Sequence, residues 1–367
     1  MNRRYEFRYN TQIGEVEYRE RFSFQFYFHP IDKRAQNSIM LDAQSEGIGV
    51  WDRDIDRYLH SNRVPIYNPL EEFLFHLPHW DGKDRIHALA NRVPCKNPHW
   101  ELLFHRWFLN MVSHWRGVDK MHANNTSPIL VGRQGTHKST FCREMIPPAL
   151  RAYYTDSIDF SHKRDAELYL NRFALINIDE FDQITLPQQG FLKHILQKPV
   201  VNLRKPHGRS VLELQRYASF IGTSNQKDLL TDPSGSRRFI CIEVTGNIDT
   251  TQPIDYEQLY AQAMHEIHHG ERYWFDSEDE QIMTENNREF EQTPAMLQLF
   301  YQYFKAAQTK EEGEFLTPVE ILNYLKKKSG ISLSDNKVYH FGRLLQKCGI
   351  PSKHTYKGTV YQVIKLS

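Results

Sequence analysis

Two short stretches of the sequence contain residue types that could together bind and cleave a nucleoside triphosphate. The first, PILVGRQGTHKSTF at residues 128–141, has two glycines followed by Lys138 and Ser139. Glycines allow backbone N–H groups to point at phosphate oxygens, a lysine can reach the β and γ oxygens, and a serine hydroxyl can hold Mg²⁺. The sequence therefore predicts a phosphate-binding loop, with Ser139 as a Mg²⁺ ligand, made of Gly132, Arg133, Gln134, Gly135, Thr136, His137, Lys138, Ser139 and Thr140.

The residues on either side of this loop suit the elements that must position it. Pro128–Val131 is a short apolar run, as expected of a buried parallel strand. A helix over Ser139–Met145 would direct its positive end at the phosphates. The alternative is a chance glycine turn, but the strand and the helix that the motif requires are both predicted. His137 replaces the second glycine of the common pattern G-x-x-x-x-G-K-[ST], and we expect it to fit without a positive φ angle.

The second stretch, FALINIDEFD at residues 173–182, is an apolar strand that ends in adjacent acids. Asp179 is expected to orient Mg²⁺ through water, and Glu180 to accept a proton from the attacking water. Acids at strand ends are common and can be purely structural. These two, however, begin 41 residues after Lys138, with a strand and a helix predicted between, and this spacing favours a catalytic pair.

Two further groups of polar residues adjoin apolar strands. Tyr217–Ser224 is followed by Asn225, whose amide could hydrogen-bond a γ-phosphate or its attacking water. The residues NQKD differ from the N-K-x-D pattern that selects guanine, so ATP is the expected nucleotide. The loop DPSGSRR carries Arg237 and Arg238, and a guanidinium can stabilise charge on a transferring phosphoryl group, in cis or from a neighbouring subunit. The sequence leaves open which arginine does so.

Residues 200–214, VVNLRKPHGRSVLEL, predict a β-hairpin around a Pro-His-Gly turn. Its tip has four basic or imidazole groups and no acid. It could contact DNA phosphates, or it could be a solvated turn. The residues concerned are Arg204, Lys205, His207 and Arg209.

A metalloprotease-like pattern occurs further along the chain, where HEIHH places His265 and His269 on one face of a predicted helix, with Glu266 between them. No third zinc ligand is evident and Gly270 ends the helix at once. We therefore favour a solvated helix end over a zinc site.

The composition is that of an ordinary globular protein, with 40% hydrophobic and 25% charged residues in 367, enough for two or three domains. The sequence has no long apolar run and no apolar signal core near its start, so we expect a cytoplasmic protein without membrane contact. The four cysteines lie far apart, which argues against a disulfide framework or a cysteine zinc site.

The expected organisation has four parts. Residues 1–119 form a mostly helical accessory region with a β-like run at Phe22–Phe28, and residues 276–314 are an acidic connector. Between them, residues 120–275 form a parallel α/β core. Residues 315–367 predict a winged helix-turn-helix, with a capping box at Thr317. Its second helix, Asp335–Cys348, is basic on one face and apolar on the other, and a hairpin with its turn at Lys357-Gly358 follows. This last part could bind DNA or another protein; the predicted DNA contacts are Lys337, Arg343 and Lys347.

Taken together, these features resemble the virulence-associated protein E family, AAA+-type P-loop ATPases of phages, plasmids and other mobile elements that are related to superfamily 3 helicases. The resemblance runs from residue 68 to residue 275. It is carried by NPLEEFLFHLPHWDGKDRI, the phosphate loop, RKPHGR, IGTSN and DPSGSRRF.

By matching positions, the resemblance implies phosphate-loop roles for Lys138 and Ser139, and metal and water roles for Asp179 and Glu180. It further implies a sensor role for Asn225 and an arginine finger at Arg237 or Arg238. The RKPHGR turn falls where superfamily 3 helicases carry a DNA-tracking hairpin, and the HEIHH helix becomes family structure. Such proteins often follow a primase domain, which makes a separate primase a candidate partner here.

We therefore expect an ATP- and Mg²⁺-dependent DNA helicase or origin-melting motor, acting as a homo-oligomeric ring, such as a hexamer, in the replication of a mobile element. The competing hypothesis is a DNA-binding initiator or regulator with weak ATPase activity. His137 and the basic C-terminal part motivate that alternative.

Overall fold

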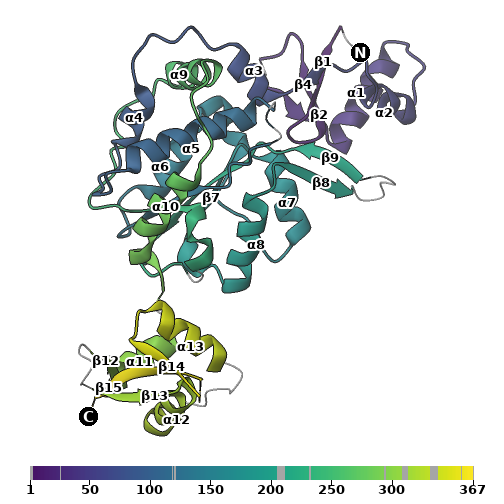
Figure 1. Cartoon of the computed structure of the whole chain (residues 1–367). Helices are drawn as coiled ribbons and strands as arrows, with labels where there is room; N and C mark the ends of the chain where they lie inside the picture. The colour runs from purple at the N-terminus through teal and green to yellow at the C-terminus, as the bar shows by residue number, and fades with distance from the viewer. Residues whose placement is uncertain are drawn as a thin grey trace. The chain divides into compact units, whose positions relative to one another are not determined.

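The computed structural model describes residues 3–24, 26–117, 119, 121–204, 211–230, 233–292, 295–307, 313–330, 338–356 and 358–366. The chain divides into two compact units, Met1–Glu291 and Gln292–Ser367 (Figure 1). Each unit has its own hydrophobic core, so each is described by itself.

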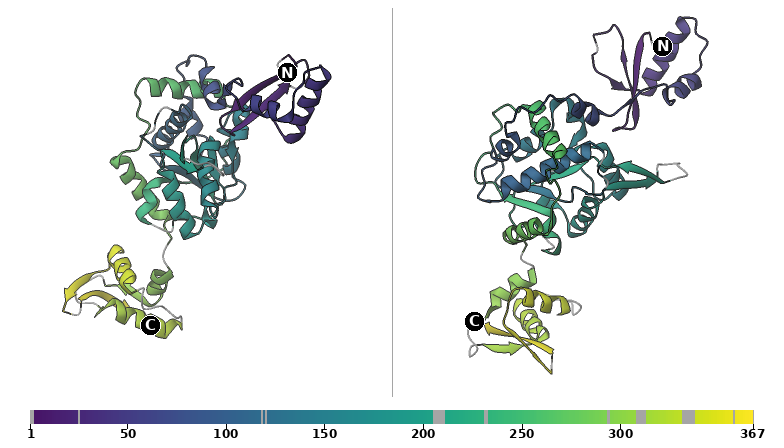
Figure 2. Two further views of the ribbon diagram at one scale, coloured as in Figure 1. Left: turned by 90° about the vertical axis from the view of Figure 1, so that its right-hand side faces the viewer. Right: turned by 45° about the horizontal axis from the view of Figure 1, so that its top comes forward.

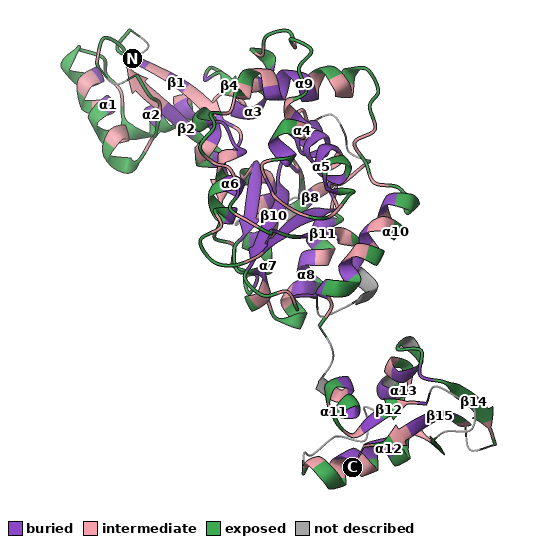
Figure 3. Ribbon diagram, turned by 90° about the vertical axis from the view of Figure 1, so that its left-hand side faces the viewer, coloured by how far each residue is buried: buried purple, intermediate pink, exposed green. Residues whose placement is uncertain are grey.

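The larger unit is built around a five-stranded parallel sheet with the strand order β11-β5-β10-β7-β6. Figure 3 shows β10 and β11 of this sheet as buried ribbons. Strands that are covered on both faces need apolar side chains on both, which explains the continuous apolar runs in the sequence. The expected parallel α/β arrangement is therefore confirmed. The strands are β5 (Ser127–Val131), β6 (Tyr154–Thr155), β7 (Leu175–Ile178), β10 (Ser219–Ser224) and β11 (Phe239–Glu243).

Alternate side chains along these strands pack on opposite faces of the sheet. Leu130 and Ile221 belong to one hydrophobic cluster, whereas Ile129 and Phe220 belong to the other. The first cluster includes side chains from α5 (Trp100–Trp115), α6 (Lys138–Glu144), the 3₁₀ helix η1 (Pro148–Tyr153) and α9 (Tyr256–His268). The second includes side chains from α7 (Lys163–Arg172) and α8 (Leu186–Leu196).

The N-terminal region contains a small sheet as well as the expected helices. The sheet has the order β3-β2-β1-β4, with strands β1 (Tyr5–Asn10), β2 (Glu15–Glu20), β3 (His29–Pro30) and β4 (Ile66–Tyr67). The helices are α1 (Lys33–Ser45), α2 (Asp52–Leu59), α3 (Pro69–Phe75) and α4 (Arg85–Ala90). The strand expected at Phe22–Phe28 was wrong: Phe22 has a φ of 63°, and Phe24 and Tyr27 are exposed. Aromatic residues favour strands only where a surface is available to pack against.

The acid-rich segment 276–314 does not form a separate connector, in contrast to the expectation. The helix α10 (Ser277–Asn286) and the 3₁₀ helix η4 (Asn287–Phe290) belong to the larger unit, and Met283 and Phe290 are buried in its core. Because many of the exposed residues of this segment are acidic, its composition resembles that of a linker, although Met283 and Phe290 pack in the core. The boundary between the units therefore falls after Glu291.

The predicted hairpin is formed by β8 (Val200–Arg204) and β9 (Val211–Gln215), which pair antiparallel and extend outward from the larger unit (Figure 2). Its tip, residues 205–210, lies outside the described residues. At its base, the buried Arg216 donates hydrogen bonds to the carbonyl oxygens of Leu196, Lys198, Ala218 and Asn124. One guanidinium thus ties the end of α8, the start of β10 and the segment before β5 together.

In the residues that the structure describes, the smaller unit packs three helices with a sheet. In this sheet β15 (Gly358–Lys365) pairs antiparallel with β12 (Phe304–Ala306), β13 (Glu314–Leu316) and β14 (Ser352–Thr355). The helices are α11 (Ala295–Tyr303), α12 (Pro318–Ser329) and α13 (Val338–Lys347). The capping box predicted at Thr317 is present, with Glu320 as its partner. The β14–β15 hairpin also forms where the sequence predicts it. No described helix is long and apolar enough to span a membrane.

Candidate nucleotide-binding site

Three adjacent strands of the central sheet end beside one another. Strand β10 lies between β5 and β7. Its last residue, Ser224, pairs with Val131 at the end of β5, and Gly222 pairs with Ile178 at the end of β7. The residues that follow these strands therefore begin at the same edge of the sheet. There the Gly132 N–H donates to Ser224 O at 3.0 Å. This places the predicted phosphate loop, the two acids and Asn225 together, although they are far apart in the sequence.

Lys138 is buried and its ammonium points back into the loop. Nζ donates to Gly132 O at 2.7 Å, to Arg133 O at 2.8 Å and to Asn225 Oδ1 at 3.3 Å. Burial lowers the pKa of Lys138, although the nearby Asp179 charge opposes that shift. The bond to Asn225 links the loop directly to the strand beside it.

The loop backbone requires glycine-like geometry at three positions. Gly135 has a φ of 83°, and a Cβ at Gly132 would lie 3.0 Å from Val244 O. His137 has a φ of 65°, so the expectation that it fits without a positive φ was wrong. It is the cap residue before α6, where the chain turns from the loop into the helix. Histidine tolerates this conformation better than β-branched residues do.

The two predicted acids differ in their surroundings. Asp179 Oδ1 accepts hydrogen bonds from Ser139 Oγ at 3.0 Å and from Thr223 Oγ1. The carboxylate is thereby held against the serine that the sequence assigns to Mg²⁺. Glu180 is exposed with a φ of 52°, and it lines a cavity of about 210 Å³ together with Asp179 and Asp156. The structure brings both acids to the loop edge, as predicted.

Asp182 is a polar residue of the site that was not predicted from the sequence. Its Oδ1 accepts from Ser224 Oγ at 2.8 Å and from the Asn225 N–H at 3.3 Å. Burial raises the pKa of this carboxyl, but hydrogen bonds from Ser224 and Gln183 outweigh burial and leave the pKa below its usual value. The signal that could have revealed it is its position two residues after Glu180, in the turn that leads away from the strand.

The structure does not bring Arg237 and Arg238 to the phosphate loop of the same chain. Both precede β11, and β11 runs parallel to β5 with Phe239 opposite Ser127. They therefore lie at the amino edge of the sheet, one strand length of about 15 Å from the loop edge. Within the larger unit, Arg237 Nη1 contacts Glu280 Oε2 on α10 at 2.9 Å.

Most of the predicted DNA contacts fall outside what the structure describes. Lys205, His207, Arg209 and Lys337 are not among the described residues, and for Arg204 and Lys347 the backbone alone is described. Arg343 is exposed on α13, whereas Phe341 and Leu345 of the same helix are buried. The apolar face expected for this helix is therefore confirmed.

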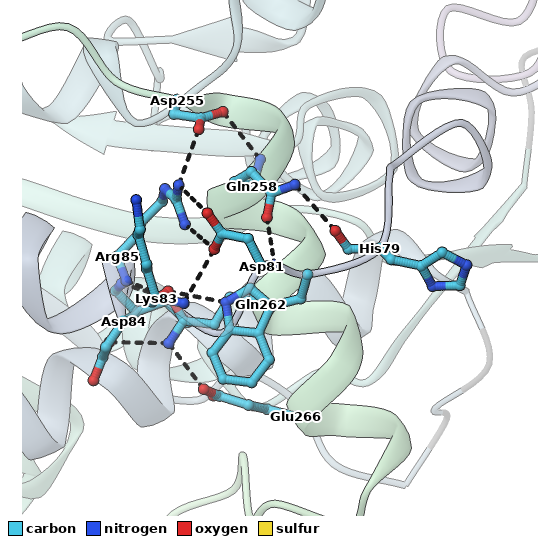
Figure 4. A network of polar contacts seen from close by, with 11 residues as sticks. His79, Asp81, Lys83, Asp84, Arg85, Asp255, Gln258, Gln262 and Glu266 are labelled. Carbon is cyan, nitrogen blue, oxygen red and sulfur yellow. Dashed lines mark hydrogen bonds and ion pairs between the residues drawn. The ribbon is translucent and has the colours of Figure 1, made fainter.

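Glu266 of the HEIHH pattern belongs to a polar network between α9 and the segment before α4 (Figure 4). Glu266 accepts from Gln262 Nε2 at 2.9 Å and contacts His105 Nε2 on α5 at 2.6 Å. The rings of His265 and His269 stack on each other instead. Gln258 accepts from the Asp81 N–H at 2.9 Å, one helical turn before Gln262. Among the described residues, no group of three or more histidines, cysteines or acids could hold a metal ion.

The chain matches two family profiles. The profile of the virulence-associated protein E-like domain matches residues 74–292, and a second profile, described as a domain of unknown function (DUF3874), matches residues 293–363. No curated protein sequence matches the chain.

Among solved structures, the apo structure of the NrS-1 C terminal region (305-718) is similar with a TM-score of 0.48 and 12% identity, covering 100% of this chain and 97% of that one. The A form of the same region gives a TM-score of 0.48 and 11% identity. The profile match, by contrast, spans more than half of the chain and ends next to the boundary between the units. The chain therefore belongs to the virulence-associated protein E-like family.

Proposed function

We propose that the chain is a ring-forming ATPase of the AAA+ type that uses ATP hydrolysis to melt or unwind DNA in the replication of a phage or other mobile element. The observation that carries the proposal is the meeting of Lys138, Asp179 and Asn225 at the ends of three parallel strands. Ligands of open parallel sheets bind in the crevice outside these strand ends.

Lys138 favours an anionic ligand in particular. Its side chain belongs to a residue that is 6% exposed, and among the described residues its hydrogen bonds go to neutral oxygens of the loop and of Asn225. A buried charge is costly unless a group of opposite charge accompanies it, and the nearby Asp179 offsets the effect of burial on the Lys138 pKa only in part. Phosphate oxygens would provide that charge while the lysine stays where it is.

The residues also fit Mg²⁺, because Ser139 Oγ and Asp179 Oδ1 are oxygen atoms of the kind this ion prefers and lie 3.0 Å apart. Mg²⁺ held there would neutralise charge on the β- and γ-phosphates. Glu180 would accept the proton of the attacking water, and Asn225 would orient that water or the γ-phosphate. Catalysis would thus consist of positioning and electrostatics, with no covalent intermediate on the protein.

The position of the arginines supports a site that is completed between subunits. Arg237 and Arg238 lie at the sheet edge opposite the phosphate loop, too far away to reach a nucleotide bound there in the same chain. A homo-oligomeric ring, such as a hexamer, would bring the arginines of one subunit to the nucleotide of the next.

Two parts of the chain support DNA as the second ligand. The β8–β9 hairpin extends from the amino end of β10, the strand whose other end carries Asn225, and its tip contains the RKPHGR sequence. The last 47 residues carry nine Lys and Arg against one Asp. We further propose that the smaller unit is a winged helix. We also propose that the protein acts in the cytoplasm and that a primase is a candidate partner.

The nucleotide assignment is tested by steady-state ATP hydrolysis with and without DNA. We expect Lys138→Ala to lose ATP binding or turnover by roughly a hundredfold or more. Glu180→Gln should bind ATP yet hydrolyse it more slowly by a similar factor. Glu257→Gln, at an exposed position on α9, is the matched control and should behave as the wild type. Unchanged turnover in both site variants would refute the assignment.

The motor assignment is tested by strand displacement on a forked duplex. Replacing Arg204, Lys205 and His207 together with Ala should leave nucleotide binding and DNA-independent hydrolysis intact, because none of them is proposed to contact ATP. DNA stimulation and strand separation should be lost together. A triple variant that unwinds the fork at the wild-type rate would show that DNA is gripped elsewhere.

The second candidate function is a DNA-binding replication initiator or regulator with weak ATPase activity. The left-handed conformation of His137, in a loop where phosphates must approach the backbone, is the observation that favours it. Multiple-turnover hydrolysis separates the two functions, since an initiator of this kind would hydrolyse ATP slowly and would show no DNA-stimulated strand separation.

A further inference from the structure

We propose that Arg237 is the arginine that completes a neighbouring subunit's nucleotide site, and that Glu280 holds it at rest until a second copy of the chain docks. This inference rests on the proposed function, since it concerns the trans arginine of that site. It goes beyond that function in two ways. It chooses Arg237 over Arg238, and it gives Glu280 the role of holding Arg237 until the neighbouring subunit is in place.

Hydrogen bonds from a buried side chain hold the backbone around Arg237 in place. Asn287 is fully buried, and its Nδ2 donates to Ser236 O and Phe239 O, both at 2.7 Å. Its Oδ1 accepts from the Cys241 N–H at 3.3 Å. The 3₁₀ helix η3 (Pro233–Arg238) is therefore fixed at its end and at the start of β11. Movement of Arg237 is then a matter of side-chain rotation and not of refolding the loop.

The side chains of the two arginines differ in accessibility. Arg237 is exposed, with a side-chain exposure of 47%, whereas Arg238 is partly buried and its Nε is enclosed by protein. An arginine that must reach another subunit needs a solvent-facing side chain with space around it. Arg237 borders a cavity of about 400 Å³ whose other walls come from α10 and η4, including Glu280, Glu285 and Arg288.

The contact with Glu280 has the properties of a releasable restraint. The Arg237 Nη1 to Glu280 Oε2 distance is 2.9 Å, and both side chains are partly exposed to solvent. Pairs of this kind contribute little net stability, because water and salt screen them. A triphosphate carries more negative charge than one carboxylate, so a nucleotide in a docked neighbour would compete successfully for the guanidinium.

The test measures ATPase activity as a function of protein concentration. Glu280→Gln should lower the protein concentration that gives half-maximal specific activity by up to about fivefold, since the resting contact no longer competes with docking. The activity at saturating protein should be unchanged. Glu285→Gln removes the same charge from the same helix and lines the same cavity, so it is the matched control and should show no shift.

Two outcomes would overturn the proposal: a half-maximal concentration that is unchanged or higher in Glu280→Gln, or a gain that persists when Arg237→Ala is added. If wild-type activity is itself independent of protein concentration, the trans site of the proposed function fails and this inference fails with it.

A second readout tests the resting contact without hydrolysis. At low protein concentration, phenylglyoxal should modify Arg237 faster in Glu280→Gln than in the wild type, as measured by peptide mass spectrometry. Equal rates would show that Glu280 does not restrain Arg237.

Discussion

At the residue scale, backbone strain accompanies the candidate site. Among the described residues, the non-glycine residues with positive φ are Phe22, His137 and Glu180, and the last two border the proposed nucleotide position. A left-handed residue costs about 1–2 kcal/mol, so it persists only where its surroundings hold it. The start of α6 holds His137, and the turn into the 3₁₀ helix η2 (Phe181–Gln183) holds Glu180.

This strain predicts a graded response at His137. His137→Gly should bind ATP at least as tightly as the wild type, because glycine adopts a φ of 65° without a steric cost. His137→Val should bind it roughly tenfold more weakly, since a β-branched residue resists that conformation. Fluorescence titration with a labelled nucleotide measures both affinities, and thermal melting checks the fold. Weaker binding by the glycine variant would mean instead that the imidazole contacts ATP.

Asp182 is predicted to position Asn225 and not to bind ATP itself. In Asp182→Asn, the amide oxygen can still accept from Ser224 Oγ and the Asn225 N–H, but it no longer carries the negative charge that strengthens both hydrogen bonds. We expect kcat to fall by about fivefold with little change in KM, because exchanging a charge-assisted hydrogen bond for a neutral one costs about 1 kcal/mol.

A double-mutant cycle decides whether Asp182 acts through Asn225. If it does, adding Asp182→Asn to Asn225→Ala should lower kcat hardly any further. Fully additive losses would place the two residues in separate roles.

At the scale of elements, α5 connects the sheet to the helices of the first cluster. Trp107 Nε1 donates to Phe220 O in β10 at 3.1 Å, and Trp115 Nε1 donates to Ala174 O, just before β7, at 3.3 Å. Two indole N–H groups thus bond backbone carbonyl oxygens of or beside the strands that carry Asn225 and Asp179. Helix α5 therefore holds these two strands at their amino ends, opposite the ends that lead to Asn225 and Asp179.

His114, near the end of α5, predicts a pH-dependent contribution to stability. It is buried, its Nε2 accepts from the Asn124 N–H at 2.7 Å, and burial lowers its pKa to about 3. The unfolded chain binds a proton near pH 6.5, whereas the folded protein does not bind it until about pH 3. Stability from this group is therefore fully present above pH 6.5 and is lost as the pH falls towards 3.

Urea unfolding at several pH values measures this contribution. Between pH 6.5 and pH 5 the wild type should lose about 1.5 kcal/mol more of its free energy of unfolding than His114→Gln, in which the group cannot titrate. Parallel pH profiles for the two proteins would contradict a buried neutral histidine.

At the scale of the whole molecule, the two units match two separate family profiles, and their boundary after Glu291 lies one residue before the change of profile. Each unit has its own core. The larger one contains every residue proposed to contact nucleotide, and the smaller one contains all nine Lys and Arg of residues 321–367.

We therefore expect a chain that ends at Glu291 to fold and hydrolyse ATP near the wild-type rate in the absence of DNA. Its binding to duplex DNA should weaken, and the log-log dependence on salt should become less steep by about 0.9 for each DNA phosphate that the smaller unit would have neutralised. Fluorescence anisotropy over a range of salt concentrations measures that slope. If the slope is unaltered, the smaller unit binds protein instead of DNA.

Much of the candidate site could be predicted from the sequence, because its signals are local. The glycines and Lys138 follow an apolar run directly, as do Asp179 and Asn225, and parallel strands bring their carboxyl ends to one edge of a sheet. The capping box at Thr317 and the hairpin turn near Gly358 depend likewise on neighbours within a few residues.

What the tertiary structure alone decided depends on contacts between distant segments. The contact of Glu280 with Arg237 joins residues 43 positions apart, and that of Asp182 with the Asn225 N–H also joins residues 43 apart, so no local pattern indicates either. The acidic surface of α10 resembles a linker in composition, but Met283 and Phe290 anchor the segment in the core. Which polar side chains meet depends on how segments far apart in the sequence pack together. The residue types around each side chain do not reveal that packing.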